Sequence, residues 1–170
     1  ALLGKSALYL GDSIAYGAGD ELGLSWAGRI AQKGITYENV AVSGWAVTPP
    51  ETSGRSQIVT QLDNAKKEHY DFVILEGGVN DVLINERESA HPISFGEITA
   101  DGTDFDTSTI CGAIEELIVK TKAKFPNATV GYIINNEFGA TADDMTKYIN
   151  AVKKACDKHG IAYVDLYNDE

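Results

Sequence analysis

The run Phe72–Glu76 (FVILE) constrains the fold more than any other stretch of this chain. Four apolar residues in succession are typical of a parallel strand that is covered on both faces. Similar short apolar runs alternate along the chain with segments of helical spacing. We expect strands at Ser6–Leu10, Thr36–Val42, Phe72–Glu76, Thr129–Ile134 and Ile161–Leu166, and helices at Trp26–Lys33, Ser56–Lys67, Ile110–Phe125 and Ala142–His159. This alternation predicts an α/β fold, a three-layer α/β/α sandwich with a five-stranded parallel sheet.

The length of 170 residues suits one domain, spanning residues 1–170. The formal net charge of −11 disfavours nucleic acid and anionic membranes as partners, because both would be repelled. No segment approaches the roughly 18 apolar residues of a membrane span. Cys111 and Cys156 fall on apolar helix faces without metal-ligand spacing, and the acidic segment 101–106 is too short for a calcium loop. We therefore expect no metal, while the compartment and the oligomeric state stay open.

Three residues with complementary chemistry each follow one of the first three predicted strands. Ser13 offers a hydroxyl, Gly44 a backbone N–H without a Cβ beside it, and Asn80 a carboxamide. Because the carboxyl ends of parallel strands meet at one edge of the sheet, these groups are expected to converge. A nucleophile surrounded by fixed N–H donors is what acyl transfer requires, so Ser13 N–H, Gly44 N–H and Asn80 are candidates for an oxyanion hole.

The segments around these residues resemble a known family. GDSIAYG (11–17), NVAVSG (39–44) and GGVND (77–81) are similar to the first three sequence blocks of the SGNH, or GDSL-type, esterases and lipases. The resemblance implies a flavodoxin-like fold, a nucleophilic Ser13, an oxyanion hole completed by Gly44 and Asn80, and no cofactor. Ile14 stands where the family motif has leucine, which is a conservative change.

The fourth block of the family, Asp-x-x-His near the C-terminus, does not occur in this sequence. In the family it supplies the general base and the aspartate that orients it. His69 and His159 precede strands, so they are expected at the wrong edge of the sheet, whereas His91 follows a strand and is a candidate for substrate contact. We therefore expect the natural chain to continue past Glu170, and these 170 residues alone to be nearly inactive.

Several neighbours of the motifs are candidates for supporting roles. No helical spacing appears between Gly11 and Ser25, and we expect Asp12 to shape an open loop there. Asp81 either bonds to nearby backbone and holds Asn80 or is a solvated turn residue. Tyr16 and Trp45 either contact the substrate or pack on the surface.

The function that these observations predict is hydrolysis of a carboxylic ester through an acyl-serine intermediate. A small-molecule or carbohydrate ester with a short acyl group, such as acetyl on a sugar, is the favoured substrate. One alternative is a non-catalytic module of the same fold that binds a carbohydrate or another ligand. A nucleotide or flavin carrier is disfavoured, because Asp12 and Asp20 in the loop after the first strand would repel phosphate.

Overall fold

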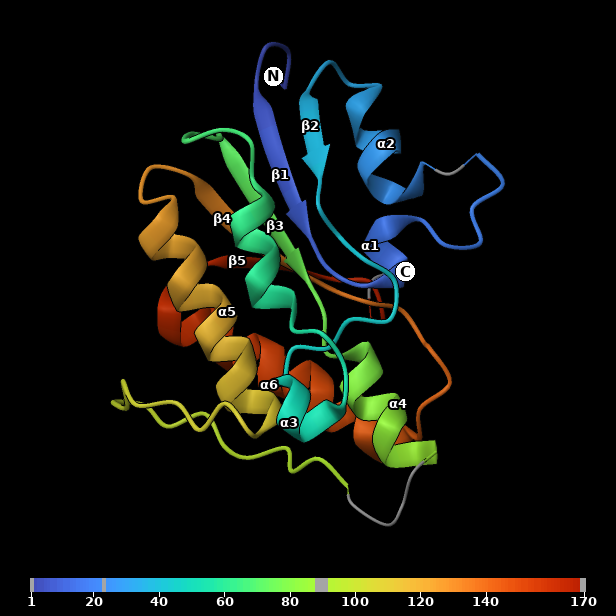
Figure 1. Cartoon of the computed structure of the whole chain (residues 1–170), viewed down its shortest axis with the longest axis vertical. Helices are drawn as coiled ribbons and strands as arrows, with labels where there is room; N and C mark the ends of the chain where they lie inside the picture. The colour runs from blue at the N-terminus through green and yellow to red at the C-terminus, as the bar shows by residue number, and fades with distance from the viewer. Residues whose placement is uncertain (1, 23, 88–91, 169–170) are drawn as a thin grey trace.

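The computed structural model describes residues 2–22, 24–87 and 92–168 (Figure 1). Five parallel strands form one sheet in the order β2-β1-β3-β4-β5. The strands are β1 (Ser6–Leu10), β2 (Thr36–Asn39), β3 (Phe72–Glu76), β4 (Thr129–Ile134) and β5 (Ala162–Asp165). This is the strand order of flavodoxin-like folds. The predicted α/β fold with a five-stranded parallel sheet is confirmed.

Strand β3 lies in the middle of the sheet, between β1 and β4. Val73 and Leu75 are buried in the larger hydrophobic cluster, while Phe72 and Ile74 pack on the opposite face. Both faces of this strand therefore contact apolar side chains, which explains the unbroken apolar run that identifies it in the sequence.

The two faces of the sheet are covered unequally. The helices are α1 (Ser13–Tyr16), α2 (Ser25–Ala31), α3 (Pro50–Ser53), the 3₁₀ helix η1 (Ile58–Asn64), α4 (Val79–Arg87), α5 (Ile110–Lys124) and α6 (Ala142–His159). Side chains of η1, α5 and α6 form the larger cluster with the strands on one face. On the other face, α2 packs Ala27 against β1 and lies beside β2 (Figure 1).

On the face that carries α2, the strands β4 and β5 have no helix over them in the described part of the chain. An apolar groove of about 240 Å³ lies there, lined among others by Trp26, Ile74, Ile133, Tyr163 and Val164. Half of the surface of Val164 is exposed. The second helical layer is therefore incomplete over this half of the sheet.

The predicted helix at Ser56–Lys67 is wrong in type and in extent. The chain forms η1 instead, and Ala65, the residue after it, is already extended. The buried residues of this segment are Ile58, Val59, Gln61 and Leu62. Residues three positions apart, such as Ile58 and Gln61, lie on the same face of a 3₁₀ helix as well as of an α-helix. The apolar spacing of this segment therefore does not distinguish the two.

Gln61 gives η1 a specific contact with the end of β1. The Gly11 N–H donates to Gln61 Oε1 (3.0 Å), and Gln61 Nε2 donates to the Gly11 carbonyl (2.8 Å). A primary amide carries the same donor and acceptor as a peptide unit. The Gln61 side chain therefore extends the hydrogen bonding of β1 by one residue beyond its last paired residue, Leu10.

Short helices occupy segments that the sequence indicates as loops. The expectation that no helix begins before Ser25 is wrong, because Asp12 caps α1, which starts at Ser13. Strand β2 ends at Asn39, earlier than the predicted Val42. The N–H groups of Val40 and Val42 still donate to the Tyr9 and Gly11 carbonyls, at 3.0 and 3.1 Å. The Asn39 side chain donates to the Ala15 carbonyl at 2.8 Å and accepts from the Ala41 N–H at 3.1 Å.

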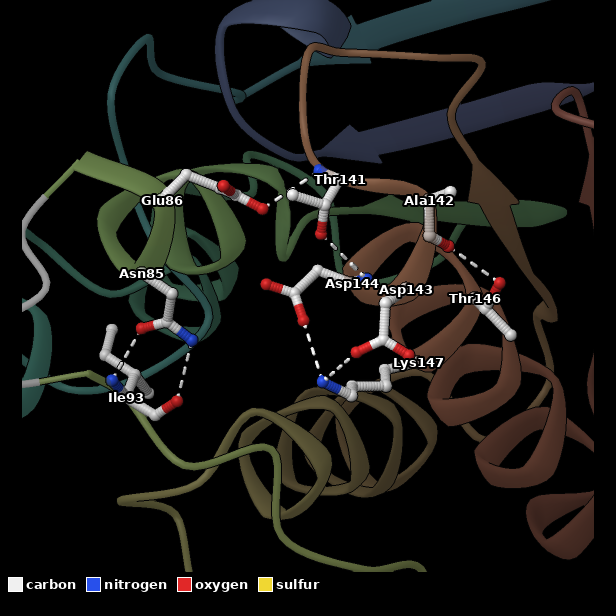
Figure 2. A network of polar contacts seen from close by, with 9 residues as sticks. All are labelled: Asn85, Glu86, Ile93, Thr141, Ala142, Asp143, Asp144, Thr146 and Lys147. Carbon is white, nitrogen blue, oxygen red and sulfur yellow. Dashed lines mark hydrogen bonds and ion pairs between the residues drawn. The ribbon is translucent and has the colours of Figure 1, made fainter.

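Figure 2 shows polar contacts that join the end of α4 to the start of α6. The Thr141 side chain caps α6 by accepting from the Asp144 N–H (3.3 Å), and the Thr141 N–H donates to Glu86 Oε1 (2.9 Å). Asn85 bonds to both the N–H (2.6 Å) and the carbonyl (2.8 Å) of Ile93. These bonds fix the position of α4 and of the chain at Ile93 relative to α6.

Candidate active site

Ser13 lies on a constrained turn at the carboxyl end of β1. Asp12 is the N-cap of α1, and its Oδ1 accepts from the Ile14 N–H at 2.9 Å. The bond from Asn39 to the Ala15 carbonyl holds α1 against the end of β2. Ser13 is half-buried and is the first residue of α1. The hydroxyl is thus carried by a turn that two neighbouring strands position.

The segment after β2 contains Gly44 in a left-handed conformation, with φ of 83°. Residues with a Cβ rarely adopt this conformation, so the position favours glycine. The Gly44 carbonyl accepts from Arg55 Nη1 at 3.3 Å. Next in the chain, the Trp45 carbonyl accepts from Asn80 Nδ2 at 2.7 Å. This bond places Asn80 beside the Gly44 segment although they are far apart in the sequence.

Asn80 belongs to the first turn of α4, which begins directly after β3 and two glycines. The carbonyl of the first of these, Gly77, accepts from the hydroxyls of Tyr132 (3.1 Å) and Tyr148 (3.2 Å). Phenols from β4 and α6 therefore hold the turn that leads to Asn80. The Asn80 side chain is half-buried and is oriented by its bond to the Trp45 carbonyl.

Asp81 is fully buried, so it is not a solvated turn residue. Its carboxylate accepts from the backbone N–H groups of Val47 (2.9 Å) and Thr48 (3.0 Å) and from the Thr48 hydroxyl. Burial raises the pKa of Asp81, and these hydrogen bonds oppose the rise. Asp81 holds the segment that follows Gly44, and through it the carbonyl to which Asn80 bonds.

Asp12 is also fully buried, and it lies against a residue that sequence reasoning missed. The Asp12 N–H donates to Glu76 Oε2 at 3.0 Å. Burial raises the pKa of Asp12 to about 6, against the opposing effect of its hydrogen bond with the Ile14 N–H. Glu76 ends the apolar strand β3, and a carboxyl group at the end of a doubly covered strand is the signal that would have marked it.

The aromatic candidates differ in exposure. Tyr16 is exposed on α1, with 56% of its surface accessible, and Trp45 is half-buried and packs against the larger hydrophobic cluster. Trp45 is adjacent to Gly44, and its carbonyl holds Asn80. Part of the Trp45 ring therefore belongs to the core.

The histidines fall on the expected sides of the sheet where the structure describes them. His69 is exposed just before β3, and His159 ends α6 and contacts Glu115 Oε1 at 2.8 Å. Both precede strands and lie at the edge opposite Ser13. His91 lies outside the described residues. Within residues 2–22, 24–87 and 92–168, no group of three or more His, Cys, Asp and Glu side chains could hold a metal ion.

Several hydrogen-bond donors remain unused at the edge of the sheet that carries Ser13. Among the bonds of the described residues, none uses the N–H of Ser13 or of Gly44, and Asn80 uses one of its two amide hydrogens. Two backbone N–H groups and one amide N–H are therefore available at the edge of the sheet that carries the Ser13 hydroxyl.

These features define an α/β protein of flavodoxin-like topology with polar groups gathered at the carboxyl ends of its first three strands. The chain belongs to the GDSL-like lipase/acylhydrolase family, whose model matches residues 9–170. Family membership supports ester hydrolysis as its general chemistry. No helix in the described ranges is long and apolar enough to cross a membrane.

Solved structures with the same fold come from several bacteria. A protein from Lactobacillus plantarum is 21% identical with a TM-score of 0.74, and the match covers 99% of this chain and 80% of that one. A GDSL-like lipase from Bacteroides uniformis is 22% identical with a TM-score of 0.72, covering 98% and 85%. An acetylxylan esterase from Geobacillus stearothermophilus is 17% identical with a TM-score of 0.61, covering 97% and 77%. Among curated protein sequences, none matches this chain.

Proposed function

We propose that the protein hydrolyses carboxylic esters through an acyl-serine intermediate on Ser13. The observation that supports this proposal is a set of unused donors on the segments that follow the first three strands: the N–H groups of Ser13 and Gly44 and one amide hydrogen of Asn80. Ser13 Oγ attacks the ester carbonyl carbon and gives up its proton, and the carbonyl oxygen becomes an oxyanion that the three donors stabilise. The alcohol leaves with a proton, and water then releases the acid from Ser13.

A histidine is the group we propose as the proton acceptor. The acetylxylan esterase is known in a catalytic mutant in which a histidine is replaced by alanine. His69 and His159 of this chain are excluded by their place at the opposite edge. The role proposed for His91 is contact with the substrate. A serine hydroxyl without a base is a weak nucleophile, so turnover depends on this acceptor.

We propose a short-chain ester of a carbohydrate as the substrate. Two of the structural neighbours are mutants of one Geobacillus enzyme, described as an acetyl-xylooligosaccharide esterase and as an acetylxylan esterase. Trp45 directly follows Gly44, and the exposed Tyr16 lies three residues after Ser13. Aromatic rings at these positions suit contact with the apolar face of a sugar.

A binding module that keeps the pocket but does not turn over substrate is the second candidate. It is favoured by one observation: the histidines that the structure describes both lie away from Ser13. In this case the donors would hold the carbonyl oxygen of an acetylated sugar without covalent attack.

Covalent labelling with a fluorophosphonate probe distinguishes these functions. The protein and its Ser13→Ala variant are treated with the probe, with and without added imidazole as an external base, and the adduct is located by peptide mass spectrometry. We expect an adduct on Ser13 only, strengthened by imidazole if the internal base is lacking. Equal labelling of the Ser13→Ala variant would overturn the assignment. An unlabelled wild-type protein that still binds acetylated xylooligosaccharides would establish the binding module instead.

A further inference from the structure

Glu76 is a fully buried carboxyl group directly beneath the turn that carries Ser13. Its Oε2 accepts from the Asp12 N–H (3.0 Å), and its Oε1 accepts from Asn135 Nδ2 (2.6 Å). Glu76 thus joins the end of β3 to the turn after β1 and to the residue after β4. Nothing in the proposed acyl transfer uses it directly.

The contact between Glu76 and the turn is close. A Cβ on Gly11 would lie 2.5 Å from Glu76 Oε2, a separation that real Cβ atoms essentially never show. Gly11 therefore allows the carboxyl group to lie against the backbone of the turn, and the turn cannot move toward β3 without meeting it.

The hydrogen bonds leave one oxygen of Asp12 without a donor. Asp12 Oδ1 accepts from the Ile14 N–H, but Oδ2 is buried and has no partner among the described residues. The Glu76 carboxyl group lies against Asp12, since Glu76 Oε2 is 3.0 Å from the Asp12 backbone nitrogen. Two ionised carboxylates have no hydrogen to share, whereas a proton held by one of them would give Oδ2 the donor it lacks.

The surroundings favour the neutral form of one carboxyl group. The titratable groups that act on the pair are Asp81 from α4 and the phenols of Tyr132 from β4 and Tyr148 from α6. Neither Asp12 nor Glu76 has an ion-pair partner among the residues that the structure describes. Burial, followed by the charge of Asp12, raises the pKa of Glu76 well above its usual value.

We propose that Glu76 is a positioning residue: it stays protonated at neutral pH and donates its proton to Asp12 Oδ2. The donated bond fixes the Asp12 side chain, whose other oxygen caps α1 and so orients Ser13. Its relevance to catalysis rests on the function proposed above, whereas the proton itself is a property of the folded protein that can be measured without turnover.

The first test compares the pH dependence of stability in the wild type and in Glu76→Gln. A glutamate that is protonated when folded and ionised when unfolded takes up a proton on folding, so stability falls as pH rises above its unfolded pKa. Glutamine does not titrate. Between about pH 5 and the folded pKa of Glu76, the ratio of the unfolding constants, wild type over Glu76→Gln, should rise about tenfold per pH unit. Urea denaturation measures both constants.

Glu68→Gln is the matched control, because Glu68 is exposed and the substitution removes the same formal charge. Its stability curve should run parallel to that of the wild type. A ratio for Glu76→Gln that does not change with pH would overturn the proposal, since Glu76 would then be ionised at neutral pH.

The second test asks whether the proton matters to Ser13. Glu76→Ala removes the donor, and labelling of Ser13 by the fluorophosphonate should slow about tenfold or more because the nucleophile is displaced. Glu76→Gln keeps an N–H donor and should recover most of the rate. Equal labelling of all three proteins would overturn the positioning role. If Ser13 is not labelled even in the wild type, the proposed hydrolase function fails, and the stability ratio alone still decides where the proton lies.

Discussion

A carboxamide carries two hydrogens, and Asn80 shows how one of them can orient the other. Its bond to the Trp45 carbonyl fixes the plane of the amide before any ligand arrives, so the second hydrogen needs no reorganisation on binding. The sequence identifies Asn80, Gly44 and Ser13 as candidates because each follows a strand. It does not identify Glu76, because that residue is the last of an apolar run, and its partner Asp12 is brought to it only by the pairing of β1 with β3.

Asn80→Ala should lower kcat for ester hydrolysis by about 10²–10³ in the catalytically active protein, because one oxyanion donor is lost. Steady-state kinetics on p-nitrophenyl acetate measure the change. Asn150→Ala, the same substitution at an exposed position on α6, is the control and should not change kcat. An Asn80→Ala enzyme within a factor of about two of the wild type would remove Asn80 from the oxyanion hole, since a lost donor normally has a far larger effect.

At the scale of the element, the five strands and the long helices α5 and α6 are predictable because their apolar spacing extends over enough residues. The short helices α1 and α3 have four residues each, too few to show a period. They depend instead on local features such as the Asp12 cap and Pro50 in the first turn of α3. The segment after Gly44 is held by Asp81, and its conformation depends on a side chain that approaches from another part of the chain.

The Asp81→Asn variant tests how far the segment after Gly44 depends on this carboxylate. Three donors now share the two carboxylate oxygens of Asp81, whereas an asparagine side chain has only one oxygen that can accept. The amide hydrogens of the asparagine would also face the backbone N–H groups of Val47 and Thr48. We expect a loss of about 1–3 kcal/mol in the free energy of unfolding, measured with urea at pH 7.

Thr48→Val provides the comparison, because it removes the hydroxyl contact alone and leaves both backbone bonds to Asp81 in place. Its loss should be smaller, about 1 kcal/mol. Equal stability of Asp81→Asn and the wild type would show that the segment after Gly44 is held by its other contacts.

At the scale of the whole molecule, the main feature is the asymmetry between the two faces of the sheet. The alternating pattern predicts helices on both faces, and α2 lies on the second face but leaves β4 and β5 open in the described residues. A sequence pattern shows which strands are apolar, but the area that each helix covers depends on packing. The groove beside Trp26 is the result.

The open groove should bind a fluorescent apolar dye such as anilinonaphthalene sulfonate in the native protein. Val164→Lys places a charge in it and should reduce the fluorescence by at least about half, while stability changes by less than about 0.5 kcal/mol. Leu22→Lys is the control, because Leu22 is 70% exposed and is not part of the groove lining. Unchanged fluorescence of Val164→Lys would show that the dye binds elsewhere.

The pair of hydrogen bonds between the Gln61 side chain and the Gly11 backbone also affects the order in which contacts can form while the chain is synthesised. Strand β1 and Gly11 need β2, the Gln61 side chain fifty positions after Gly11, and finally β3 before all their hydrogen bonds exist. Contacts so distant along the chain form slowly. During synthesis, the turn at Ser13 therefore waits for partners that are made later, so it is among the last parts of this fold to acquire its final geometry.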